Sequence, residues 1–179
     1  MKIAGVDEVG LGCLAGPVVS AAVIIGDKGS EIIFKDSKKT SEKNRYIQAK
    51  HIRQNFYVGI GIATSEEIDC LNVLRASHLS MERAIMNLPI IPDSILIDGK
   101  YIPNKMVNAE AVIKGDTKHQ EIAAASIVAK VLRDRLMVAY SVNFSNYSLE
   151  KNKGYPTKDH KEAINQFGLS NIHRKSFKI

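Results

Sequence analysis

Two adjacent acidic residues stand inside the first apolar segment of the chain, and they restrict the fold more than any other feature. Residues 5–9 have the composition of a buried strand, yet Asp7 and Glu8 lie within it. A carboxylate seldom occupies such a position without partners, because removing a lone charge from water is costly. Neighbouring residues of a strand point to opposite faces, so both side chains can serve one site only where the strand twists or bulges. Otherwise Glu8 contributes its main-chain carbonyl or supports the other ligands from a second layer.

Two further acids follow apolar segments at positions typical of strand ends. Asp98 ends residues 94–98, and Asp116 lies between a strand at residues 109–114 and a long helix. Because strand ends meet at one edge of an α/β sheet, the four carboxylates are expected to converge there. They would repel one another unless cations bind, and oxygen ligands select Mg²⁺ or Mn²⁺. A pair of such ions can cleave a phosphodiester. Taken singly, Asp98 also suits a strand-end turn and Asp116 a helix N-cap.

The apolar pattern predicts an α/β fold with a mixed sheet, antiparallel at first and parallel later, flanked by helices on both faces. Strands are expected at residues 5–9, 17–25, 32–34, 57–63, 94–98 and 109–114. Helices are expected from Ser41, from Ser65, over residues 118–140 and over residues 157–167. Leucines and isoleucines between Leu71 and Leu88 form the apolar face of the second helix. We expect residues 1–179 to form one domain, with a basic, helical C-terminal segment from about residue 142.

The charge of the chain indicates a polyanionic partner. Lys and Arg number 25 against 19 Asp and Glu, a formal net charge of +6. Residues 150–179 hold seven Lys or Arg against three acids, which is +4 of that total. Clustered cations suit nucleic acid, because each neutralised phosphate releases counterions, although a solvated basic face is the alternative. His160 and His173 lie in the same segment and are candidate phosphate contacts.

Several classes of protein do not fit the sequence. It has no apolar run of about 18 residues, which excludes a transmembrane helix. Two acids near the N-terminus, without a long apolar stretch, exclude a secretory signal. Cys13 and Cys70 belong to no CxxC motif, so neither a disulfide framework nor a structural zinc site is expected. This use of cysteine indicates a reducing compartment, the cytoplasm.

Short motifs along nearly the whole chain resemble those of ribonuclease HII, the type 2 ribonuclease H. They occur in family order between residues 3 and 177, and the ordered set is far more specific than any one motif. They are AGVDEVGLG at 4–12, AGPVV at 15–19, DSKK at 36–39, IDG at 97–99, KGD at 114–116, AAASI at 123–127, AKV at 129–131, RD at 133–134, NKGYPT at 152–157 with His160, and HRKSF at 173–177.

The resemblance implies a ribonuclease H-like fold and a metal-dependent endoribonuclease. Such an enzyme hydrolyses RNA in RNA–DNA hybrids and incises 5′ to a lone ribonucleotide in duplex DNA, leaving 3′-hydroxyl and 5′-phosphate ends. Two Mg²⁺ or Mn²⁺ ions and a monomeric enzyme are expected. The implied catalytic and metal-binding residues are Asp7, Glu8, Asp98 and Asp116. The implied substrate-binding residues are the junction-sensing turn Gly10, Leu11 and Gly12, the sugar-stacking Tyr155, and the phosphate contacts Lys39 and Lys153.

The chain departs from the family pattern at one position, and two other classes of protein fit parts of it. The family turn reads Gly-Arg-Gly, so Leu11 implies weaker junction recognition with the metal ligands intact. An actin-like or sugar-kinase ATPase shares the acidic first strand followed by glycines, but such enzymes need two domains. A non-catalytic nucleic-acid-binding module explains the charge but not the carboxylates in the strands.

Overall fold

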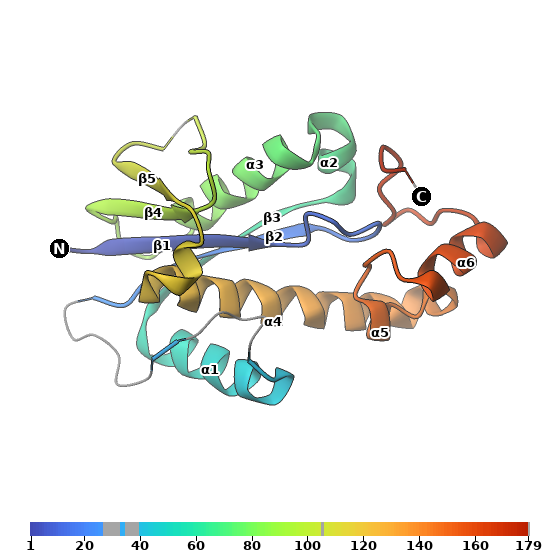
Figure 1. Cartoon of the computed structure of the whole chain (residues 1–179), viewed down its shortest axis with the longest axis horizontal. Helices are drawn as coiled ribbons and strands as arrows, with labels where there is room; N and C mark the ends of the chain where they lie inside the picture. Colours follow the sequence, from blue (N-terminus) through green and yellow to red (C-terminus); the bar gives the residue numbers. More distant parts are fainter. Residues whose placement is uncertain (27–32, 35–39, 105, 179) are drawn as a thin grey trace.

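The centre of the protein is a five-stranded mixed sheet (Figure 1). The computed structural model describes residues 1–26, 33–34, 40–104 and 106–178. The strand order is β3-β2-β1-β4-β5, with β1 antiparallel to β2, β2 antiparallel to β3, and β4 parallel to both β1 and β5. The strands are β1 (Ile3–Val9), β2 (Val18–Ile24), β3 (Tyr57–Ala63), β4 (Ser94–Asp98) and β5 (Ala109–Val112). The predicted change from antiparallel to parallel pairing is confirmed.

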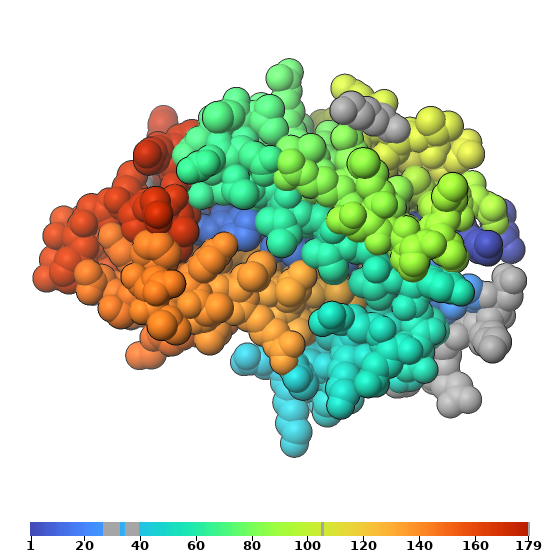
Figure 2. Space-filling model, turned by 180° about the vertical axis from the view of Figure 1, so that it is seen from behind, coloured from blue at the N-terminus to red at the C-terminus, as the bar shows by residue number. Residues whose placement is uncertain are grey.

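Helices cover both faces of this sheet. The long helix α4 packs against β1 and β2 with α1 beside it, whereas α3 packs on the opposite face against β2 and β3. Seen from behind, α3, α1 and α4 leave little of the blue N-terminal strands visible (Figure 2). The helices are α1 (Glu42–Asn55), α2 (Ser65–Leu71), α3 (Val73–Met86), α4 (Gln120–Asn143), α5 (Leu149–Asn152) and α6 (Lys158–Phe167), with 3₁₀ turns η2 (Gly115–Thr117) and η3 (Ser145–Tyr147). None of the helices in the described ranges is both long and apolar enough to cross a membrane.

The contact between β1 and α4 places the acidic strand against the longest helix. A Cβ atom on Gly5 would lie 2.2 Å from the backbone of Glu121, so only glycine permits this approach. The first turns of α4 are correspondingly small, with Ala123, Ala124 and Ala125 fully buried. Their close packing against the strand holds one face of α4 beside Asp7 and Glu8.

The prediction of a short strand at residues 32–34 is wrong for the two of these residues that the structure describes. Ile33 and Phe34 lie outside any strand, and Ile32 is outside the described residues. Phe34 is buried edge-on against Phe56. Its backbone N–H and C=O bond to the side-chain amide of Gln120 on α4, at 2.7 and 3.1 Å. The apolar pattern signalled burial, and a side chain rather than a neighbouring strand satisfies the backbone.

The helical region after residue 65 is two helices, and its predicted apolar face is only partly right. Asn72 has a φ of 71° and separates α2 from α3, while its side chain caps α3. Leu71 and Leu74 are exposed. The fully buried positions of α3 include Ala76, Ser80 and Ala84, because the helix packs closely on the glycine-bearing strand β3. Small side chains, rather than leucines, therefore form the contact.

Candidate active site

The four acidic residues singled out in the sequence line one cavity of about 520 Å³. Asp7 and Glu8 come from β1, Asp98 from the end of β4, and Asp116 from the 3₁₀ turn η2. The other side chains that line the cavity come from the turn after β1, from α4 and from the C-terminal segment. They are those of Val9, Leu11, Ser126, Lys130 and Tyr155, and the backbone of Gly10 and Gly12 completes the wall. The fold thus gathers residues between positions 7 and 155 around one space.

Asp7 and Glu8 both reach this cavity although they are neighbours on a strand. The strand ends at Val9, immediately after them. The N–H of Glu8 donates to Oδ1 of Asp7 at 2.7 Å, so the Asp7 carboxylate leans along the strand toward its end. The pairing of β1 with β2 continues in register to Val9. The cavity therefore lies over the end of the strand, where both faces are within reach.

The pKa of Asp7 is strongly affected by burial and by neighbouring charges. Burial raises the pKa of its carboxyl group well above the usual value, and the charges of Glu8 and Asp98 raise it further. Hydrogen bonds from the Ser126 hydroxyl and from the N–H of Glu8 lower it only in part. The fold thus places a carboxyl group where its surroundings disfavour the charged form, as is common at functional sites.

Asp98 and Asp116 are joined through the turn between them. Oδ1 of Asp98 accepts the N–H of Gly115 at 2.7 Å, which ties the end of β4 to the turn that carries Asp116. The alternative role of Asp116 as the N-cap of the long helix is wrong, because α4 is capped at His119. Nothing in the cap structure therefore requires an acid at position 116.

The chemistry of this cavity suits a hard divalent cation. All four candidate ligands are carboxylates, the donors that Mg²⁺ and Mn²⁺ prefer. In the described part of the chain, no three His, Cys, Asp or Glu side chains are already arranged to hold a metal ion. Burial is the main cause of the raised pKa of Asp7, and the charges of Glu8 and Asp98 add to it. A cation bound between the carboxylates would offset this repulsion.

The turn after β1 contains one glycine that the fold requires and one that it does not. Gly10 has a φ of 100°, and a Cβ atom there would lie 2.3 Å from Nε of Arg133. Around Gly12, by contrast, a Cβ atom would meet nothing within 4 Å. The side chain of Leu11 between them is 40% exposed. The outer surface of the turn is therefore open to a ligand in the cavity.

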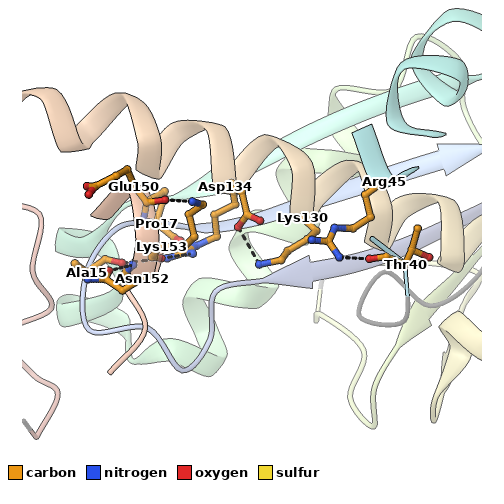
Figure 3. Close-up of polar contacts among 11 residues, drawn as sticks. Ala15, Pro17, Thr40, Arg45, Lys130, Asp134, Glu150, Asn152 and Lys153 are labelled. Atoms are coloured by element: carbon orange, nitrogen blue, oxygen red, sulfur yellow. Dashed lines mark hydrogen bonds and ion pairs between the residues drawn. The ribbon is translucent and has the colours of Figure 1, made fainter. Parts of the chain in front are cut away.

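Ser126 and Lys130 line the cavity but were not assigned a role from the sequence. They are four residues apart on α4, so they share one face of the helix. Nζ of Lys130 donates to Asp134 at 2.9 Å (Figure 3). It also lies 5.4 Å from the centre of the Tyr155 ring. The available signal was the spacing of two polar residues within an otherwise apolar helical stretch.

Tyr155 stands in the cavity wall with its hydroxyl turned toward the protein. Its side chain is hydrogen-bonded to the buried thiol of Cys13, and burial raises the pKa of the phenol. The aromatic ring of Tyr155, rather than its hydroxyl group, is therefore available to a ligand in the cavity.

Lys153 lies beside this site, and Lys39 is outside the described residues. The Lys153 ammonium donates to the carbonyl of Glu150, and its own carbonyl accepts from Arg133 at 2.8 Å (Figure 3). Its side chain also lines a second cavity of about 450 Å³, together with Lys43 and Arg45 of α1. Basic side chains outnumber acidic ones around this second cavity, which is also lined by Arg135, Glu42 and Asp134.

The prediction that His160 and His173 contact phosphate is wrong, because both rings are buried. The N–H of Ser170 donates to Nδ1 of His173 at 3.0 Å, which assigns the ring proton of His173 to Nε2. That Nε2 donates to Nε2 of His160 at 3.1 Å, and Nδ1 of His160 donates to the carbonyl of Tyr155 at 2.9 Å. The chain of bonds requires two neutral rings and holds the backbone of Tyr155 in place.

Because both rings of this histidine pair are neutral, we predict that the protein loses stability in acid. Burial lowers the pKa of both rings, and the neighbouring His160 helps to lower that of His173 to about 4. Between the unfolded pKa of about 6.5 and pH 4, the unfolded chain binds the extra proton, so the free energy of unfolding falls as the pH falls. We expect His173 to account for about 3 kcal/mol over this range.

The measurement is denaturant unfolding of the wild type and of His173→Asn at several pH values from 7.5 to 4. In His173→Asn, the free energy of unfolding should depend less on pH than in the wild type. His51→Asn on α1 should show the wild-type pH dependence. If the free energy of unfolding fell with pH equally in the wild type and in His173→Asn, the assignment of two neutral rings would be contradicted.

Comparison with known proteins gives consistent results. A family profile described as ribonuclease HII matches residues 4–179. A protein of Ruegeria pomeroyi named ribonuclease HII is 51% identical over 179 residues, 99% of this chain and 76% of that protein. The crystal structure of the ribonuclease H2 from Pyrococcus horikoshii has a TM-score of 0.82 at 27% identity, covering 99% of this chain and 94% of that one. Bst-RNase HIII in complex with Mn²⁺ has a TM-score of 0.72 at 18% identity, covering 93% and 70%. The predicted ribonuclease H-like fold is thereby confirmed.

Proposed function

The chain belongs to the ribonuclease HII family and is a ribonuclease H-type endonuclease, and from that premise we propose a specific reaction for it. It hydrolyses the RNA strand of RNA–DNA hybrids and incises duplex DNA 5′ to embedded ribonucleotides. The products carry 3′-hydroxyl and 5′-phosphate ends. The observation that carries this proposal is the meeting of Asp7, Glu8, Asp98, Asp116 and Tyr155 around one cavity.

The carboxylates are the proposed ligands of two Mg²⁺ or Mn²⁺ ions. The four carboxylates would hold these ions, which when bound would supply an activated water for attack and charge stabilisation for the leaving oxygen. The chemistry of the four donors supports this class of ion, and the Mn²⁺ complex of Bst-RNase HIII is consistent with it. Asp7 is the central ligand in this proposal, because it is the most buried of the cavity's carboxylates and lies on β1, the strand that pairs with β4, which ends at Asp98.

The rest of the cavity positions the substrate. The exposed turn formed by Gly10, Leu11 and Gly12 approaches the ribose, whose 2′-hydroxyl distinguishes RNA from DNA. The Tyr155 ring offers a surface for the adjoining sugar, and Lys130 places a cation beside it for a phosphate. We include the C-terminal segment from about residue 142 in the substrate-binding part, because it carries Lys153 and Tyr155.

The proposal is tested with a DNA duplex that contains one ribonucleotide, incubated with Mg²⁺, with Mn²⁺ or with EDTA. We expect a single nick 5′ to the ribonucleotide, only with metal, and a 3′ end that a DNA polymerase extends directly. Binding without nicking in the presence of metal would favour a nucleic-acid-binding module instead. ATP hydrolysis without nicking would favour an ATPase of similar topology.

The position of Lys153 predicts a change in the salt dependence of binding. Lys153→Glu should reduce the slope of log affinity against log salt by about one unit if the ammonium pairs with a phosphate. The matched control is Lys2→Glu, an exposed lysine just before β1, at the opposite end of that strand from Asp7 and Glu8. Binding is measured in EDTA at several salt concentrations. A slope equal to that of the wild type would place Lys153 outside the interface.

A further inference from the structure

Two fully buried arginines lie beneath the turn that follows β1. Arg174 is 1% exposed, and its guanidinium donates to the carbonyls of Gly10 at 2.6 Å, Leu11 at 2.9 Å and Gly16 at 2.9 and 3.0 Å. Arg133 is 0% exposed and donates to the carbonyls of Pro17, Ala15 and Lys153 at 2.9, 3.0 and 2.8 Å. Six carbonyl groups of two separate segments thus converge on two cations.

These two cations have no carboxylate partner within 4 Å in the part of the chain that the structure describes. Burial lowers the pKa of Arg174 to about 10, with the charge of Arg133 as a further cause, so the group remains protonated at neutral pH. Buried cations are costly, and here backbone carbonyls compensate them in place of an acid. The ring of Phe177 lies 5.1 Å from the Arg174 guanidinium and closes the site.

The direction of the carbonyls sets the direction of the N–H groups. The described peptide bonds are all trans, and in a trans peptide the N–H points opposite to the C=O of the preceding residue. Because the carbonyls of Gly10 and Leu11 point inward to Arg174, the N–H groups of Leu11 and Gly12 point away from it. Neither N–H donates a hydrogen bond to another described residue, and both residues line the catalytic cavity.

We propose that Arg174 is a positioning residue for substrate recognition, which aims the backbone N–H groups of Leu11 and Gly12 at an oxygen of the ribose–phosphate backbone. The inference rests on the proposed function and adds to it how this turn recognises its substrate. A guanidinium holds two successive carbonyls in one orientation, because its donors lie in a rigid planar fork. Consecutive N–H groups with the same orientation form a concave site for anionic or polar oxygens.

A pair of substitutions at Leu11 tests the N–H directly. Leu11 and Gly12 are the central residues of a turn closed by Cys13 and Gly10, and neither has a positive φ, so proline fits the first central position. Leu11→Pro removes the backbone N–H of residue 11. Leu11→Ala removes most of the side chain and keeps that N–H. The readout is the ratio of the dissociation constants for an all-DNA duplex and for the same duplex with one ribonucleotide, measured in EDTA.

The wild type and Leu11→Ala should prefer the ribonucleotide duplex, and Leu11→Pro should lose roughly three- to tenfold of that preference, the value of one hydrogen bond. Equal ratios in the proline and alanine variants would overturn the proposal, as would a wild type with no preference. A wild type that shows the preference but never nicks with metal would defeat the proposed function and leave this recognition standing.

The role of Arg174 is tested by Arg174→Lys, which keeps the charge but not the fork. We expect at least the same loss of preference, because Arg174 orients both N–H groups, and a double variant with Leu11→Pro should lose no more than Arg174→Lys alone. Additive losses would show that Arg174 does not act through this N–H. Ile52→Ala, on the buried face of α1, is the control for lowered stability and should reduce the melting temperature without changing the ratio.

Discussion

Asp7→Asn is expected to lower turnover by several orders of magnitude and, in metal-free buffer, to raise the melting temperature. The carboxylate is buried beside Glu8 and Asp98, which raise its pKa. An aspartate whose folded pKa lies above its unfolded value destabilises the fold at every pH at which it is ionised, so a neutral amide removes that cost. The same change removes a charged ligand of the two proposed metal ions, and we expect most of the catalysis to be lost with it. Substrate affinity should fall far less, because phosphate contacts supply much of it.

The two halves of this prediction are measured separately. Turnover is measured on the single-ribonucleotide duplex, and melting temperatures are compared in EDTA and in Mg²⁺. Mg²⁺ should stabilise the wild type more than Asp7→Asn, because ligand binding to the folded state raises its stability. Asp159→Asn, an exposed acid on α6, is the matched control and should change neither quantity. A folded Asp7→Asn protein with near-normal turnover would defeat the two-ion proposal.

Leu11→Arg is expected to raise cleavage at an isolated ribonucleotide about ten- to a hundredfold. The Leu11 side chain is 40% exposed at the wall of the cavity, so a guanidinium has room to reach a phosphate there. A hydrogen bond to a charged group contributes roughly 1.5–3 kcal/mol, and about 1.4 kcal/mol corresponds to one decade. A long RNA–DNA hybrid should gain less, because many ribonucleotides offer alternative registers.

The measurement is kcat/KM on both substrates for the wild type, Leu11→Arg and Leu11→Gln. The glutamine variant tests length and polarity without charge, and it should gain little. Equal or lower activity of Leu11→Arg on the single-ribonucleotide duplex would show that other groups already supply this contact.

The fold class and the acidic cluster were predictable because their signals are local. An apolar run with two acids inside it marked β1, and one that ends in an acid marked β4. The change from closely linked strands to strands separated by helices predicted the mixed sheet. The convergence of Asp7, Asp98 and Asp116 followed from the rule that strand ends meet at one edge. Burial could also be read at Phe34, although its strand could not, because an apolar pattern does not reveal which group satisfies the backbone.

The sequence by itself determined the strands, the small-residue contact of α4 and the positions of the acids, since these depend on residues close together along the chain. Only the tertiary structure decided what the basic C-terminal segment does with its polar side chains. Arg174, His160 and His173 read as surface cations and phosphate contacts, yet they are buried. Arg174 bonds to carbonyls more than 160 residues away, at Gly10 and Leu11, and the two histidine rings bond to each other and to the carbonyl of Tyr155. A polar side chain is stable in the interior only when such partners reach it, and composition carries no record of which backbone carbonyls the fold will bring within 3 Å.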